Sequence, residues 1–194
     1  MIDKNNYLFF IIIFAVLLCI SCGTIGSSRK AIDINGMIYD FSNRPIAHCR
    51  ITIGQRHSGI TDINGRFVLP RIPTGSYTIT VQKEGYETFS DSIFIQNQGQ
   101  IIYIRIPSQS QLLNLADEAL TAMNTDAAEE FVQRAYQIDR NNIEMLFYYA
   151  TIKFRQQKYS EAIDFLMSAR NLGSRDPYIS RLLSILLELK DEED

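Results

Sequence analysis

The chain has 194 residues, of which 46% are hydrophobic and 21% are charged, and its formal net charge is −3. This length allows one or two small domains, each with a core of its own. Because the net charge is weakly acidic and the sequence has no stripe of basic residues, nucleic-acid binding is not expected. Two histidines and three cysteines are few ligands for a zinc or iron-sulfur centre, so we expect no metal and no cofactor.

The first segment is an apolar run behind a weakly basic start. Lys4 precedes a stretch of fourteen residues without a charge, residues 7–20, which is short for a membrane-spanning helix and typical of a signal peptide. The run ends in the letters ISCG at residues 20–23, and this ending resembles the lipobox of bacterial lipoproteins. The resemblance implies that residues 1–21 are removed and that Cys22 becomes an N-terminus that carries lipid. The alternative is an uncleaved N-terminal anchor.

Residues 22–31 are predicted to be a short flexible tether, because the sequence after Cys22 is small and polar. Cys22 is followed by glycine rather than aspartate, and by resemblance to lipoproteins of diderm bacteria this favours the outer membrane. We therefore expect the chain to be held at the bacterial cell envelope by its N-terminal lipid. Only Cys49 then remains in the folded part, so no disulfide framework is expected.

Residues 32–107 are predicted to form an all-β domain. Six or seven short stretches are rich in β-branched and aromatic residues, most of them alternating with polar ones, and turn-forming letters such as SNRP and PTG separate them. Strands at this spacing indicate a small β-sandwich. The residues expected to alternate towards its core are Phe67, Leu69, Tyr77, Ile79 and Val81.

The letters TDING in this region allow two interpretations. Asp62, Asn64 and Gly65 fit part of a helical calcium loop, but Ile60 and Arg71 stand where such a loop needs carboxylates. The flanking sequences are also strand-like rather than helical. Asn-Gly between two apolar runs is a strong signal for a β-hairpin. We therefore expect a hairpin turn rather than a calcium site.

The order of motifs carries a more specific resemblance. In chain order the motifs are GMIYD (36–40), RPI (44–46), TDINGRF (61–67), IPTGSY (72–77) and GY (85–86). This order is similar to that of the carboxypeptidase regulatory-like domain, a transthyretin-like β-sandwich of seven strands. Cys49 stands where that family usually has a small residue, so it is expected to be a buried hydrophobe rather than a nucleophile.

The histidines do not indicate an enzyme. His48 is out of phase with Cys49, which is expected to point inward, so His48 is expected to face solvent. The sequence places no carboxylate or nucleophile at a catalytic spacing from His48 or His57. In metallocarboxypeptidases the module follows a separate zinc domain, for which we find no counterpart. The Tyr-Arg-Gly-Ser ending of hydroxyisourate hydrolases, which share the transthyretin-type fold, is also absent. We expect a non-enzymatic protein, with a hidden hydrolase as the alternative.

Residues 110–190 change to a helical pattern, with apolar residues three and four positions apart. Similar residues recur 34 positions apart in the pairs Leu112/Leu146, Ala116/Ala150, Leu120/Phe154, Ala128/Ala162 and Ala135/Ala169. The period and the small residues resemble the tetratricopeptide repeat, a helix-turn-helix unit. Two units and a last helix from Pro177 would give five helices. The alternative is an ordinary helical bundle.

Stacked repeats of this kind form a groove in which segments of other proteins dock. By resemblance to the family, the partner-binding residues are Phe147, Thr151, Phe154 and Arg155. The weaker equivalents in the first unit are Leu113, Asp117 and Thr121. For Phe147 and Phe154 the alternative is a place in the core.

The two halves also differ in charge, which bears on partners. Residues 30–108 carry eight lysines and arginines against six acidic residues, whereas residues 109–194 carry nine against fifteen. The sequence thus predicts a multidomain protein, all-β then all-α, that is anchored in the membrane by lipid and binds other envelope proteins or peptides through its helical repeats. A second hypothesis is that the β-sandwich binds a glycan or peptide, although the lack of tryptophan counts against a sugar platform.

Overall fold

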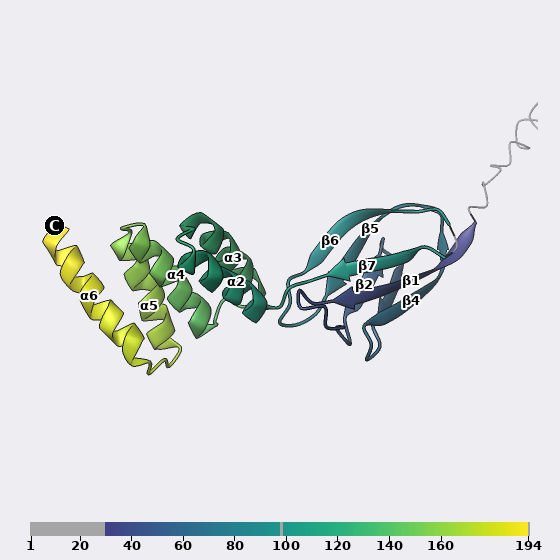
Figure 1. Cartoon of the computed structure of the whole chain (residues 1–194). Helices are drawn as coiled ribbons and strands as arrows, with labels where there is room; N and C mark the ends of the chain where they lie inside the picture. Colours follow the sequence, from purple (N-terminus) through teal and green to yellow (C-terminus); the bar gives the residue numbers. More distant parts are fainter. Residues whose placement is uncertain (1–29, 98, 194) are drawn as a thin grey trace, which may run out of the picture. The chain divides into compact units, whose positions relative to one another are not determined.

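The computed structural model describes residues 30–97 and 99–193. Cys22, the predicted signal peptide and most of the predicted tether lie outside the described residues. In the described part, an all-β region precedes an all-α region (Figure 1), which confirms the predicted fold class. The strands are β1 (Ala31–Tyr39), β2 (Arg50–Ile53), β3 (His57–Ile60), β4 (Arg66–Pro73), β5 (Gly75–Gln82), β6 (Phe89–Ile95) and β7 (Ile101–Arg105). The helices are α2 (Gln109–Thr121), α3 (Thr125–Ile138), α4 (Ile143–Arg155), α5 (Tyr159–Asn171) and α6 (Pro177–Glu193).

The strands form two sheets with a hydrophobic core between them. One sheet has the order β4-β1-β7 and the other the order β3-β2-β5-β6. Strand β1 runs antiparallel to β4 and parallel to β7. Because side chains alternate along each strand, every second residue points inward, and Ile34 and Ile38 of β1 are as fully buried as Ile51 of β2 and Ile79 of β5. The alternation thus produces the predicted sandwich.

The TDING segment is a tight turn, but the predicted hairpin is wrong. The backbone N–H of Asp62 donates to Arg66 O at 2.8 Å, and that of Gly65 donates to Asp62 O at 3.0 Å. The flanking strands β3 and β4, however, belong to different sheets. The turn therefore carries the chain from one layer of the sandwich to the other. The Asp62 carboxylate accepts the backbone N–H groups of Asn64 and Arg66, so it stabilises the turn itself.

Cys49 is buried in the sandwich core, as predicted. Its backbone N–H donates to Thr61 Oγ1 at 2.8 Å, and the Thr61 hydroxyl donates to Ile46 O at 2.7 Å. Burial raises the pKa of the Cys49 thiol. The thiol is therefore a structural group and a poor nucleophile at neutral pH.

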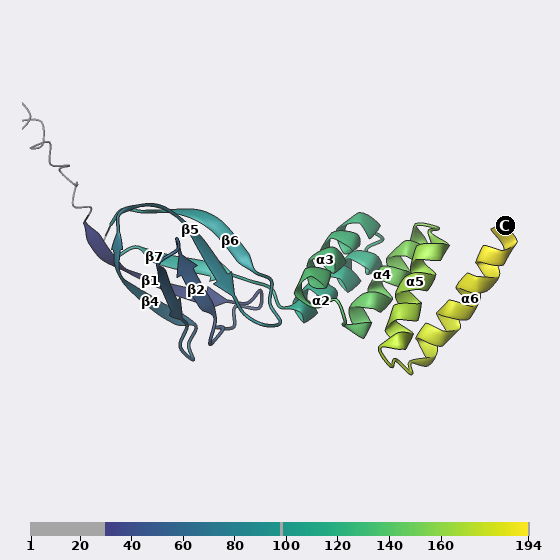
Figure 2. The same ribbon diagram turned by 180° about the vertical axis from the view of Figure 1, so that it is seen from behind.

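Helices α2, α3 and α4 begin at side-chain caps that the sequence supplies. Ser108 and Gln111 form a reciprocal capping box at the start of α2, while the side chains of Asn124 and Asn142 cap α3 and α4. Successive helices pack against one another, and α4 lies between α3 and α5 in both views (Figure 2). Local capping and sequential packing together produce a stacked array of helices.

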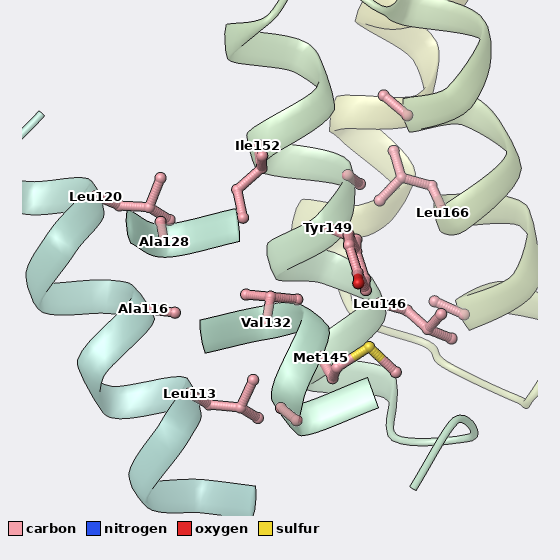
Figure 3. Packing of buried hydrophobic residues seen from close by; sticks show 14 of the residues in the cluster. Leu113, Ala116, Leu120, Ala128, Val132, Met145, Leu146, Tyr149, Ile152 and Leu166 are labelled. Carbon is pink, nitrogen blue, oxygen red and sulfur yellow. The ribbon is translucent and has the colours of Figure 1, made fainter. Parts of the chain in front are cut away.

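The 34-residue period appears in the packing and in the turns. The six alanines at 116, 128, 135, 150, 162 and 169 are fully buried where helices meet. Figure 3 shows Ala116 and Ala128 at the contact of α2 with α3, beside Leu120 and Val132. The turns also match, since Met123 and Gln157, 34 positions apart, both have φ of 60°. The repeat is therefore one of conformation as well as of sequence.

Candidate partner-binding surface

The four predicted partner-binding residues follow one side of α4. Phe147, Thr151, Phe154 and Arg155 are spaced at intervals of four, three and one along the helix, which places them on neighbouring turns of one stripe. Arg155 is exposed, while the other three are half-buried. The structure thus brings the four positions together, and whether they contact a partner remains a prediction.

Each of these side chains also has a role inside the array. The Arg155 guanidinium donates to Leu120 O at 2.8 Å, near the end of α2, so it links the two repeats. Phe147 and Phe154 pack against the helical core, and the Phe154 ring lies 6.2 Å from that of Tyr159. The Thr151 hydroxyl donates to Phe147 O of its own helix. The two phenylalanines therefore combine core packing with partial exposure.

The weaker equivalents on α2 do not all lie at the surface. Leu113 is only 1% exposed, and Figure 3 shows it directed from α2 towards the neighbouring helices, so its assignment to the groove was wrong. Asp117 and Thr121 are exposed. Burial raises the pKa of Tyr148, and the negative charges of Asp117 and Glu144 raise it further. The surface shared by α2 and α4 is therefore acidic around the Tyr148 hydroxyl.

The structure also contains a cavity of about 340 Å³ that the sequence did not predict. Residues of α3, α4 and α5 line it: Glu129, Gln133, Tyr136, Tyr149, Lys153, Glu161 and Phe165. The rings of Tyr149 and Phe165 stack 4.6 Å apart, and Tyr136 meets Tyr149 edge-on at 5.7 Å. The cavity thus combines an aromatic wall with a charged cluster.

Lys153 is the centre of that charged cluster. Its Nζ lies 2.7 Å from Glu129 Oε1 and 3.4 Å from Glu161 Oε2, although the residue is buried. Burial alone would lower the pKa of the ammonium group, but the hydrogen bonds and charges of the two glutamates outweigh it and raise that pKa. The hydrogen bond from Lys153 in turn lowers the pKa of Glu129. A lysine on the buried side of a helix was the sequence signal for this cluster, because a buried cation needs acidic partners.

The two histidines are not brought into a catalytic arrangement. His48 is exposed, as predicted, and lines a shallow hollow over β2, β3 and β5 together with Arg50 and Lys83. His57 begins β3 and is half-buried. Among the described residues, no group of three or more His, Cys, Asp or Glu side chains is placed to hold a metal ion. Within the same part of the chain, no helix is both long and apolar enough to cross a membrane.

Comparison with protein families agrees with this architecture. Residues 33–105 match the carboxypeptidase regulatory-like domain, and residues 119–186 match the tetratricopeptide repeat. The chain therefore carries a carboxypeptidase regulatory-like domain followed by a tetratricopeptide-repeat domain. Both kinds of domain are typically non-catalytic, and tetratricopeptide repeats generally mediate protein–protein interactions. A comparison with curated proteins finds no match.

Several solved structures resemble part of the chain. They include a type II cohesin–X-dockerin complex from Acetivibrio cellulolyticus, a 3-chlorocatechol 1,2-dioxygenase from Rhodococcus opacus and a catechol 1,2-dioxygenase from Pseudomonas arvilla. Their identities are 20%, 12% and 10%, and their TM-scores are 0.36, 0.36 and 0.34. The matches cover 42%, 43% and 43% of this chain and 60%, 62% and 54% of the respective solved chains. At these values the likenesses carry no inference about activity.

Proposed function

We propose that this is a non-enzymatic, lipid-anchored protein of the bacterial cell envelope that binds another envelope protein through its helical repeats. The observation that carries the proposal is the repeat array. Its helices α2 and α4 share an acidic surface around the Tyr148 hydroxyl, and exposed Asp117 and half-buried Thr151 lie on these two helices. The regulatory-like domain acts as a spacer or a second contact. The anchor is a lipid on Cys22 in the outer membrane, as the lipobox-like letters ISCG suggest.

The anchor is tested on the full chain with a C-terminal tag. Wild type and Cys22→Ala are compared by membrane fractionation and by the mass of the N-terminal peptide. We expect lipid on Cys22 and membrane association in the wild type only. An unmodified Cys22 with residues 1–21 still attached would replace the lipoprotein with an uncleaved anchor. A soluble cytosolic chain would contradict both the localisation and the envelope role.

The partner surface is tested by a pair of matched double variants. Asp117→Arg with Thr151→Arg changes the surface of α2 and α4, whereas Asp164→Arg with Ser168→Arg changes α5. Each pair makes the same charge change, and each removes one hydroxyl that donates to a carbonyl four residues earlier. Circular dichroism first establishes that both variants keep their helices.

The readout is quantitative recovery of envelope proteins from detergent-solubilised membranes. A partner of this surface should be recovered by wild type and by the α5 variant, and its yield should fall at least about tenfold with the α2/α4 variant. Equal recovery by all three proteins would show that this surface is not the binding site. That result would leave the lipid anchor unaffected.

A further inference from the structure

The outer face of the β4-β1-β7 sheet carries large apolar side chains at positions that face solvent. Val68 of β4 is 60% exposed, and Ile101 and Tyr103 of β7 are 51% and 64% exposed. Met37 and Tyr39 of β1 are half-buried on the same face. Solvent-facing positions of an antiparallel or mixed sheet are normally polar. A contiguous apolar surface of this kind marks a site of interaction.

The strand register brings these side chains next to one another. Asn35 of β1 is paired with Val68 on one side and with Ile101 on the other. Two residues further along β1, Met37 is paired with Tyr103. The apolar side chains thus form one patch that crosses all three strands. Because the polar side chain of Asn35 lies within it, the patch suits an interface that contains water better than a dry one.

Arginines surround this patch. Arg66, Arg71 and Arg105 are exposed, and within the described residues none of their guanidinium groups makes an ion pair. Asp33 is the acidic residue among the outward positions of the three strands. Three positive charges and one negative charge leave this surface with a net charge of +2. We call it the arginine-rimmed face.

The composition of the arginine-rimmed face matches the surface of an anionic bilayer. Tyrosine is enriched at membrane–water interfaces, where its ring lies at the level of the headgroups. Exposed aliphatic side chains gain free energy by entering the boundary between headgroups and acyl chains, and basic side chains are attracted to anionic headgroups. Arginine also buries its aliphatic stem while its guanidinium group stays among the phosphates. By contrast, two such faces would bring arginines together, so repulsion opposes a symmetric contact between two copies.

The position of this face in the chain also brings it to a membrane. Strand β1 is the middle strand of the face and begins at Ala31, nine residues after Cys22. Nine residues span at most about 30 Å even when fully extended. An anchor before β1, whether it is a lipid on Cys22 or an uncleaved apolar segment, therefore keeps the start of β1 within reach of the bilayer surface. At that distance even a weak affinity for lipid holds the face on the membrane, because a short tether makes its effective concentration high.

We propose that the arginine-rimmed face binds the surface of an anionic phospholipid bilayer. The inference rests on the proposed function only for the tether, because the apolar side chains and the arginines belong to the described residues. In the bound state Val68, Ile101 and Tyr103 enter the headgroup region, and the arginines contact lipid phosphates. Salt screens the attraction of the arginines, so binding is strongest at low ionic strength.

The test uses residues 30–194, which lack the apolar run, because Ala31–Asp194 form one compact unit that contains both hydrophobic cores. Binding is measured by co-sedimentation with vesicles of phosphatidylcholine, either alone or mixed with the anionic lipid phosphatidylglycerol. We expect wild type to bind the mixed vesicles and to be released from them at high salt. Its affinity for vesicles of phosphatidylcholine alone should be at least about tenfold lower.

The charge of the face is tested by a pair of matched double variants. Arg66→Glu with Arg105→Glu changes the arginine-rimmed face, whereas Arg50→Glu with Arg56→Glu makes the same charge change at exposed residues in and beside the other sheet. Thermal melts followed by circular dichroism establish that both variants are folded. The face variant should bind the mixed vesicles at least about tenfold more weakly than wild type, and the control should keep most of the affinity.

The apolar contact is followed through a single introduced tryptophan, because the chain contains none. Tyr103→Trp places it on the arginine-rimmed face. Phe94→Trp places it on the outer side of β6 in the other sheet, at a residue that is 57% exposed. On the mixed vesicles the emission of Tyr103→Trp should move to shorter wavelength and be quenched by brominated lipid, and that of Phe94→Trp should change much less.

The proposal would be overturned by absence of binding to the mixed vesicles, by equal losses in the two charge variants, or by equal quenching of the two tryptophans. Absence of binding would leave a protein as the occupant of the face. None of these results bears on the lipid of Cys22, which is tested on the full chain. A chain without that lipid would leave vesicle binding of residues 30–194 unchanged, so the two proposals fail separately.

Discussion

At the scale of single residues, the turn at Gly65 leaves no room for a side chain. Its φ is 71°, and a Cβ at this position would lie 2.6 Å from Ile38 O. We expect Gly65→Ala to lower the free energy of unfolding by about 2–3 kcal/mol, measured by chemical denaturation. Gly85→Ala is the control, because its φ is 78° but its Cβ would meet no atom within 4 Å. It should lose only about 1 kcal/mol, and equal losses would contradict the steric explanation.

Residue-level predictions succeeded where a single periodicity decides the outcome. The burial of Cys49 is in phase with that of Ile51 in β2, which begins at the next residue, whereas His48 is exposed in a turn, with φ of 57°. The prediction for Leu113 was wrong because it was inferred from the equivalent position in the other repeat, whereas the burial of Leu113 depends on the helices that pack around it. The cavity at Tyr149 was missed for the same reason, since residues of three helices form it.

At the scale of elements, the turn between α2 and α3 holds a residue in a conformation that favours glycine. Met123 has φ of 60° and is exposed, so its side chain contributes little to packing. We expect Met123→Gly to raise the free energy of unfolding of the helical domain by about 0.5–1 kcal/mol, because the left-handed strain disappears. Met123→Ala removes the same side chain without relieving the backbone, and denaturation should show no gain. A gain in both variants would point to the side chain instead.

The helical elements are also joined by Lys153, and this contact should make their stability depend on pH. Replacing Lys153 with Met leaves Glu129 and Glu161 without their shared cation, so we expect a loss of about 1–2 kcal/mol near neutral pH. Because the pKa of Glu129 is lowered, the stabilisation that its carboxylate contributes is lost as the pH falls below 4.5, the ordinary pKa of a glutamate. Because the pKa of Lys153 is raised, the stabilisation that its ammonium group contributes is lost as the pH rises above 10.5, the ordinary pKa of a lysine.

The measurement is denaturation of wild type and Lys153→Met at a series of pH values. The difference between the two proteins should be largest near neutrality and should shrink at both extremes. Lys158→Met, which removes an exposed lysine at the start of α5, should change stability by less than about 0.5 kcal/mol. A difference that stays constant with pH would show that Lys153 acts through packing alone.

The sequence predicted whether each element is a strand or a helix, but not which strands pair with one another. The strand-like flanks of Gly65 were identified correctly, yet β3 and β4 joined different sheets. A turn signal depends on a few neighbouring residues, whereas sheet membership depends on which strands pair. Here β4 pairs with β1, far back along the chain, while β3 pairs with β2, the strand just before it. The packing of the helices was easier to predict, because each helix packs mainly against its neighbour in the sequence.

At the scale of the whole molecule, the described residues hold two separate hydrophobic clusters, one in the sandwich and one among the helices. Because the clusters share no residue, loss of packing in one should leave the other intact. We expect Leu166→Ala, a truncation in the fully buried helical core, to destabilise the helices by about 2–4 kcal/mol. Far-ultraviolet circular dichroism during denaturation measures this loss.

The sandwich is followed in the same samples through Cys49, the sole cysteine of residues 30–194. Its thiol is buried and its pKa is raised by that burial, so alkylation reports opening of the sandwich core. We expect the denaturant concentration at which Cys49 becomes reactive to be the same in wild type and Leu166→Ala, while the helical transition moves to lower denaturant. A parallel shift of both signals would show that the two clusters unfold as one cooperative unit, in which case a partner bound to the repeats would also stabilise the sandwich.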